Sequence, residues 1–110
     1  MLSFTDRAKG AIIGQFIGDA MALGSHWHYN LLERERLYPE GIKGFEPPLG
    51  GHYHADRVPG DPTHYGDAAL LLLQSIVNDR GFDSRSFGRR FVSAFDSSYT
   101  GYRDKPTRLT

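Results

Sequence analysis

Apolar residues in this chain gather in two runs, separated by a polar stretch rich in glycine and proline. In the first run, residues 5–23, apolar side chains wrap most of the circumference of a helix. In the second run, 67–79, the core AALLLLQSIV is apolar nearly all round. Helices of this kind lie inside proteins, so the pattern predicts two buried helices. We expect Thr5 to cap the first and Gly24 to end it.

Two shorter helices complete the predicted all-α architecture. One fits residues 30–38, with Asn30 as the N-cap and Pro39 as the stop. Another begins after Ser84 and carries arginines away from its apolar face, which is typical of an amphipathic surface helix. That apolar face is expected to contain Phe87, Phe91, Val92 and Phe95.

The connection between the second and third helices, residues 39–66, is expected to be a long loop. It holds five of the six prolines and three of the five histidines. A loop of this length is usually either functional or disordered. Its aromatic and histidine side chains favour a functional loop.

Charge and composition narrow the class of protein. The chain of 110 residues suits one small domain, and its net charge of zero gives no attraction to nucleic acid or an anionic membrane. Without cysteine it forms no disulfide, thiolate nucleophile or Cys-ligated zinc site. It shows neither a signal-peptide pattern nor an apolar run of the ~20 residues that span a membrane. We therefore expect a cytoplasmic protein with no nucleic-acid or membrane partner.

Glycines at 10, 14 and 18 form a stripe along the first helix. Each costs roughly 1 kcal/mol of helix stability relative to alanine, so the stripe predicts close approach of another helix or a ligand. The segment lacks the preceding strand and the following Lys-Ser/Thr of a phosphate loop, which favours helix packing.

Two acids are candidates for chemistry. Asp67 opens the leucine-rich helix, where it either accepts backbone N–H bonds as a cap or faces a cleft and binds Mg²⁺. Asp19 lies in the first apolar helix and needs a partner to offset its desolvation. It either bridges to a neighbouring loop or positions a substrate or a water molecule.

The histidines form two short pairs, His26-x-His28 and His52-x-His54, with His64 alone. Side chains two residues apart in an extended segment share a face, so each pair could coordinate a transition metal such as zinc. The alternative is that these loop histidines stack, form hydrogen bonds and titrate without metal. The neighbouring aromatics suit either stacking on a flat ring or anchoring of the core. They are Trp27, Tyr29, Tyr53 and Tyr65.

Three segments together resemble the N-terminal part of the ADP-ribosylglycohydrolase family, in the branch that contains the jellyfish J-type crystallins. They are GAIIGQFIGDAMALG followed by HWHYN, the loop ending in THYGD, and the tail YTGYRDKPTRLT. The resemblance implies an all-α orthogonal multi-helix bundle about three times this length. Residues 1–110 would then be the N-terminal third of one domain, and the chain a fragment. Its uncovered apolar surface would make the isolated chain oligomeric or prone to aggregate.

Active members of that family hydrolyse the bond between ADP-ribose and an acceptor with two Mg²⁺ ions. The family's Gly-Asp pair matches Gly18-Asp19, and a family glutamate falls on His26. The family's Thr-Asp-Asp triplet aligns with Tyr65-Gly66-Asp67, and its distal Asp-x-Asp motif would lie beyond residue 110.

This alignment implies a role for each candidate residue. Asp67 would hold Mg²⁺, while His26 and Asp19 would be the catalytic pair. The side chains expected to bind the ADP-ribosyl group are Trp27, Tyr65 and His64. Two alternatives stay open: a non-catalytic, crystallin-like structural protein and a zinc-dependent variant built on the histidines.

Overall fold

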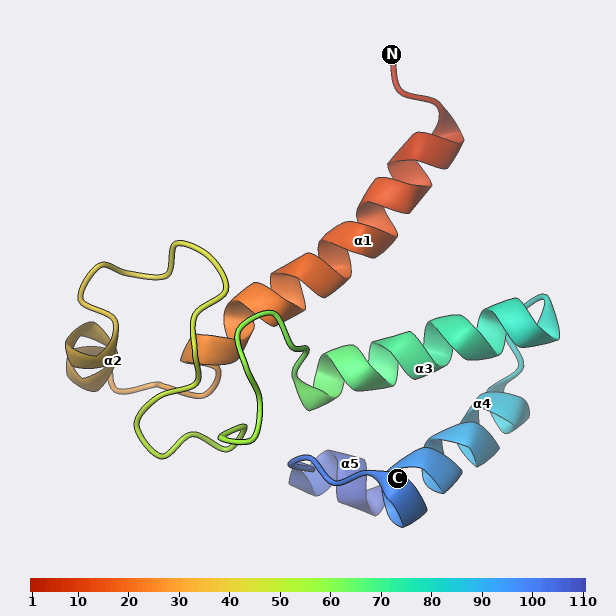
Figure 1. The fold of residues 1–110 in the computed structure, drawn as a ribbon. Coiled ribbons are helices and arrows are strands. Elements are labelled where there is room, and N and C mark those ends of the chain that lie inside the picture. The colour runs from red at the N-terminus through yellow and green to blue at the C-terminus, as the bar shows by residue number, and fades with distance from the viewer. The chain divides into compact units, whose positions relative to one another are not determined.

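The computed structural model describes residues 1–110 and contains helices but no strands, which confirms the all-α prediction. Two compact units follow one another along the chain, Met1–Thr63 and His64–Thr110. Figure 1 shows the helices of each unit. No helix combines the length and the apolar character needed to cross a lipid bilayer.

The N-terminal unit begins with the long helix α1 (Phe4–Ala22). Its cap is Ser3 and not the predicted Thr5. The Asp6 N–H donates to the Ser3 hydroxyl at 3.1 Å, and the Asp6 carboxylate accepts from the Ser3 N–H at 3.3 Å. This reciprocal capping box requires an acid three positions after the cap, and Thr5 lacks one.

At its C-terminal end α1 tightens into the 3-10 turn η1 (Leu23–Ser25). Leu23 is the C-cap of α1, so Gly24 occupies the predicted position directly after the cap, but it continues into this 3-10 turn and is buried. A Cβ atom on Gly24 would lie 2.8 Å from the carbonyl oxygen of Glu46 and 2.9 Å from its Cβ. Glycine is required here because the backbone of the long loop passes directly over it.

That close approach gives a prediction about stability. Gly24→Ala is expected to destabilise the protein by about 1–3 kcal/mol, because the methyl group forces the Glu46 backbone to move. Gly14→Ala is the matched control, since a Cβ there meets nothing within 4 Å. It should raise stability by about 0.5–1 kcal/mol through helix propensity. Urea denaturation followed by circular dichroism measures both, and equal effects would contradict the close-approach argument.

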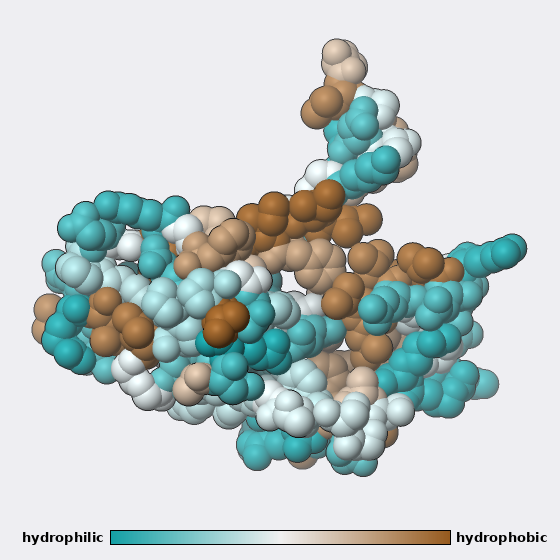
Figure 2. All heavy atoms as spheres, viewed as in Figure 1, coloured by the Kyte–Doolittle hydropathy of each residue, from teal (hydrophilic) through white to brown (hydrophobic).

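The prediction that α1 is buried is wrong for this structure. Ala20 is its one buried residue, whereas Ile13 is 57% exposed. Added Cβ atoms at Gly10, Gly14 and Gly18 would meet nothing, so the glycine stripe has no packing partner in the structure. Figure 2 shows the apolar residues of α1 open at the surface. These open residues support the predicted self-association, which stays a prediction.

The helix α2 (Leu31–Leu37) begins as predicted. Its N-cap Asn30 accepts hydrogen bonds from the N–H groups of Leu32 and Glu33 at 3.1 and 3.2 Å. No helix or strand follows until the end of the unit at Thr63, which confirms the long loop.

The Tyr38 hydroxyl organises the first half of this loop. It donates toward the carbonyl oxygens of Gly24 and Pro47, the latter at 2.7 Å, and accepts from the N–H of Leu49 at 3.2 Å. Burial, assisted by the charge of Glu46, raises the pKa of Tyr38 above its ordinary value, so the phenol stays protonated. One side chain thus ties the turn η1 to the loop backbone at Pro47 and Leu49.

The C-terminal unit contains α3 (His64–Asp79), α4 (Ser84–Val92), the π-helical turn η2 (Ser93–Ser98) and α5 (Lys105–Leu109). Within it α3 packs against α4. Asp83 caps α4 by accepting from the N–H of Ser86 at 2.6 Å. The amphipathic surface helix predicted after Ser84 is therefore confirmed.

An aromatic ladder continues from α4 through η2. Ring centroids are separated by 5.8 Å for Phe87 and Phe91, 4.6 Å for Phe91 and Phe95, and 4.6 Å for Phe95 and Tyr99. Val92 was expected on the same face but is half exposed. The ladder explains why Phe95 is the buried apolar residue of this unit.

The helix α3 differs from its prediction in two ways. It begins at His64 and not at Asp67, so Asp67 is the fourth helical residue and not a cap. It is also not buried on all sides, because Val77 is 67% exposed and its buried residues are His64, Gly66 and Ser75. An apolar sequence indicates that a helix can be buried, but it does not show which other elements pack over it.

Candidate functional site

The two histidine pairs meet in the N-terminal unit. The ring centroids of His26 and His54 are 5.5 Å apart, those of His28 and His52 are 5.3 Å apart, and those of His52 and His54 are 5.7 Å apart. The turn after α1 supplies one pair and the long loop supplies the other. Spacing along the sequence suggested each pair, and folding of the loop brings the two together.

Trp27 lies at the centre of a cluster of rings with His26, Tyr53 and His54, which we call the ring cluster. The indole centroid is 4.4 Å from that of His26, 5.1 Å from that of Tyr53 and 6.4 Å from that of His54. Trp27 and His54 are nearly parallel, at 19°. Trp27 has φ of 63°, a left-handed backbone that is uncommon for a bulky residue and that often marks functional sites.

His52 supports the ring cluster as a neutral imidazole. Its Nδ1 accepts a hydrogen bond from the N–H of His54 at 2.9 Å, which places the ring proton on Nε2. Burial, with a smaller contribution from the neighbouring His28, lowers the pKa of His52 below its ordinary value. His28 in turn directs its Nε2 at the carbonyl oxygen of Leu49, 3.1 Å away.

Asp19 binds Thr63, the last residue of the N-terminal unit. Its two carboxylate oxygens accept from the N–H and the hydroxyl of Thr63, both at 2.7 Å. Thr63 is only 1% exposed, so these bonds satisfy donors that water does not reach. The structure therefore shows the bridge to a neighbouring loop that was one of the two expectations for this acid.

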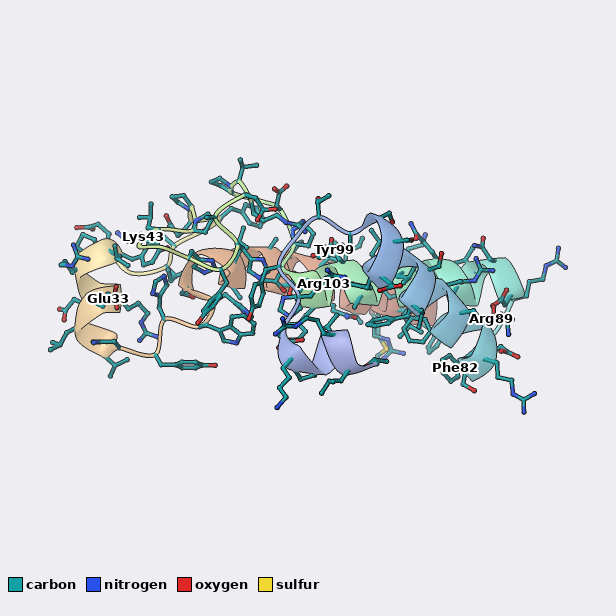
Figure 3. The ribbon with its side chains drawn as sticks, turned by 90° about the horizontal axis from the view of Figure 1, so that it is seen from below. Glu33, Lys43, Phe82, Arg89, Tyr99 and Arg103 are labelled. Carbon is teal, nitrogen blue, oxygen red and sulfur yellow. The ribbon has the colours of Figure 1, made fainter.

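In the C-terminal unit, Asp67 is half-buried and accepts a hydrogen bond from the hydroxyl of Tyr99 at 2.7 Å. Tyr99 follows η2, and Figure 3 shows it near Arg103 in the segment that leads to α5. The guanidinium of Arg103 donates to the carbonyl oxygen of Phe95 and so secures this segment.

Asp104 is the centre of a second network in the same unit. It caps α5, accepting from the N–H of Thr107 at 2.9 Å, and it also accepts from the Tyr65 hydroxyl at 2.7 Å. Its carboxylate lies 3.5 Å from Nε2 of His64. Burial alone would raise the pKa of Asp104, but hydrogen bonds from Thr107, Tyr65 and His64 outweigh it and hold the pKa well below its usual range.

The sequence-predicted residues thus fall into two groups. Asp19, His26 and Trp27 belong to the N-terminal unit, where the two rings are in contact; His64, Tyr65 and Asp67 open α3 in the C-terminal unit. Sequence reasoning missed Asp104 and Tyr99, which bind the side chains of this second group. For Asp104 a signal existed, because an acid two residues before Pro106 is typical of a helix start.

Comparison with known proteins decides the family. A family model described as ADP-ribosylglycohydrolase matches residues 2–109. The chain belongs to the ADP-ribosylglycohydrolase family. It is also similar to crystallin J1A of Tripedalia cystophora, with 31% identity over 87 residues that cover 74% of this chain and 26% of the crystallin. The chain therefore spans about a quarter of the length of this curated relative, and no solved structure matches it.

The ADP-ribosylglycohydrolase family is generally dependent on divalent metal ions, which raises the question of whether these residues fit one. At the positions of the family triplet, Tyr65 and Gly66 offer no carboxylate and Asp67 offers one. Mg²⁺ is commonly bound through one or two carboxylates, with waters and substrate phosphates completing its shell. Asp67 meets the minimum of that requirement.

Proposed function

We propose that this ADP-ribosylglycohydrolase family member is a hydrolase that cleaves the glycosidic bond of an ADP-ribosyl or related nucleotide-sugar group with the help of a divalent metal ion. The family match over residues 2–109 is the observation that carries this proposal. The ring cluster supports it, because Trp27 and His26 are partly exposed aromatic faces suited to a ribose or an adenine.

His26 is the proposed acid–base residue. In the reaction, water adds to C1 of the ribose while the bond from C1 to the acceptor nitrogen or oxygen breaks, and the acceptor leaves with a proton. A side chain that donates that proton or takes one from the attacking water touches the reacting atoms. His26 offers ring nitrogens beside the Trp27 face, in the position where the family carries a glutamate.

Asp19 and Asp67 have different proposed roles. Both oxygens of Asp19 are engaged by Thr63, so we assign Asp19 a positioning role at the end of the long loop. Asp67 would hold the metal ion, and Tyr99 orients its carboxylate. When bound, Mg²⁺ would supply positive charge to the diphosphate and ribose oxygens.

Of the two α3 residues expected to contact the substrate, Tyr65 remains a proposed contact and His64 does not. The Tyr65 hydroxyl is bonded to Asp104, but the residue is 47% exposed, so one face of its ring can meet a sugar. His64 is buried, which favours a role in holding Asp104 over direct contact with a substrate.

A non-catalytic structural protein is the second candidate, and the similarity to crystallin J1A favours it. It is consistent with the loss of the hydroxyl and the second carboxylate at Tyr65 and Gly66. In that case the ring cluster would serve only to anchor the long loop.

One assay separates the two candidates. The purified chain is incubated with N-linked and O-linked ADP-ribosyl peptides and Mg²⁺, and released ADP-ribose is measured by chromatography. We expect release to fall by about 10²-fold in His26→Ala, because general acid–base catalysis contributes that much. His28→Ala is the control, since its Nε2 is already bonded to the Leu49 carbonyl. Release that falls in His26→Ala but not in His28→Ala favours the hydrolase, and release that is equal in wild type and His26→Ala would contradict it.

A further inference from the structure

We propose that His26 and His54 form a binding site for a divalent transition-metal ion, distinct from the Mg²⁺ role proposed for Asp67. Because a bound ion occupies an imidazole nitrogen that His26 needs as an acid or a base, this ion would inhibit the proposed hydrolysis and not assist it. The ring nitrogens of these two residues lie within 4.8 Å of each other. Their rings are tilted by 54° with centroids 5.5 Å apart. The turn after α1 carries one ligand and the long loop carries the other, so a bound ion would link the two segments.

The distance between the ring nitrogens of His26 and His54 is close to the distance between two nitrogen ligands of one metal ion. Two imidazole nitrogens bound to a tetrahedral ion at about 2.0–2.1 Å lie roughly 3.4 Å apart. The present separation is compatible with that value after a small rotation of the part-exposed His26 side chain. His54 is fully buried and fixed, because its backbone N–H is bonded to Nδ1 of His52.

The donor atoms select the kind of ion. Imidazole nitrogen suits Zn²⁺, Ni²⁺ and Cu²⁺, whereas Mg²⁺ takes oxygen ligands. Affinity at a nitrogen site rises from Ni²⁺ to Cu²⁺ in the usual order. We therefore expect Cu²⁺ to bind most tightly, Zn²⁺ to compete for the same site and Mg²⁺ to have no effect.

The chain contains its own reporter for this site. Trp27 is its one tryptophan, and the indole centroid lies 4.4 Å from that of His26. Titration of the whole chain with Cu²⁺ should quench tryptophan fluorescence saturably. Excess Zn²⁺ should reverse the quenching, and Mg²⁺ should not. Absence of saturable quenching in the folded wild-type chain would overturn the proposal.

Substitutions assign the ligands. The midpoint of the titration should weaken by about tenfold or more in His26→Ala and in His54→Ala, a loss typical of damage to a metal site. Because His54 is buried, His54→Gln serves as a milder variant, and circular dichroism checks that each chain is folded.

His28→Ala is the matched control, being two residues from His26 with its Nε2 directed at a carbonyl. Its midpoint should stay within about threefold of wild type, below the tenfold loss expected for a ligand. An unchanged midpoint in both His26→Ala and His54→Gln, or an equal loss in His28→Ala, would show that the ion binds elsewhere.

Discussion

Asp104→Ala is expected to destabilise the C-terminal unit by about 3–5 kcal/mol, the loss typical of removing one partner from a buried pair. The substitution leaves the Tyr65 hydroxyl, Nε2 of His64 and the N–H of Thr107 without the carboxylate they share. It also removes the cap of α5. Urea denaturation monitored by circular dichroism measures the change.

Asp96→Ala is the matched control for Asp104. Asp96 is an exposed acid in η2 of the same unit, and its replacement should change stability by no more than about 0.5 kcal/mol.

Because the pKa of Asp104 is lowered in the folded state, its stabilising effect is present above the unfolded pKa of about 3.9 and is lost as the pH falls below it. The difference between wild type and Asp104→Asn should therefore shrink in acid. A constant difference would contradict the charged network.

Asp19→Ala should have the second largest effect, a loss of about 2–4 kcal/mol. Both the N–H and the hydroxyl of Thr63 bond to this carboxylate, and hydrogen bonds to charged groups contribute about 1.5–3 kcal/mol each. Amide hydrogen exchange at Thr63 is the sharpest measurement, because this N–H should become much less protected than in wild type.

Two further variants make the Asp19 prediction specific. Asp19→Asn keeps one carbonyl oxygen as an acceptor and should cost less than Asp19→Ala. Gln15→Ala changes an exposed side chain on the same helix and should leave exchange at Thr63 as it is in wild type. If Gln15→Ala exposed Thr63 as strongly as Asp19→Ala, the effect would come from α1 as a whole.

Local signals in the sequence were sufficient for much of the fold. Asn30 caps α2 because its side chain reaches N–H groups only two and three residues ahead. The face of α4 that carries Phe87 and Phe91 follows from helical periodicity alone. The family was also recognisable, because short motifs in a fixed order survive in the chain.

Features that depend on distant residues could not be predicted. The start of α3 moved to His64, where Asp104, forty residues later, holds both His64 and Tyr65. The close approach that requires Gly24 depends on the path of the loop at Glu46. Exposure of α1 and α3 was missed because periodicity shows which residues can be buried and not what covers them.

The candidate site shows the same division between local and distant causes. Each histidine pair could be identified from its spacing, but which pairs would meet depends on the loop that carries His52 and His54. The roles of His26, Trp27 and Asp67 stay predictions until the assays above are made. Asp19 was correctly expected to need a partner, although Thr63 could not be named from the sequence.

The left-handed backbone at Trp27 limits how this protein can change. The backbone of this tryptophan is held in a conformation that residues with a Cβ atom disfavour, at a cost of roughly 1–2 kcal/mol. Glycine or asparagine would relax the turn but would remove the surface on which His26, Tyr53 and His54 gather. Relief of backbone strain and retention of these ring contacts are therefore incompatible at this position. A substitution that lowers the strain would also remove the indole that the three neighbouring rings contact.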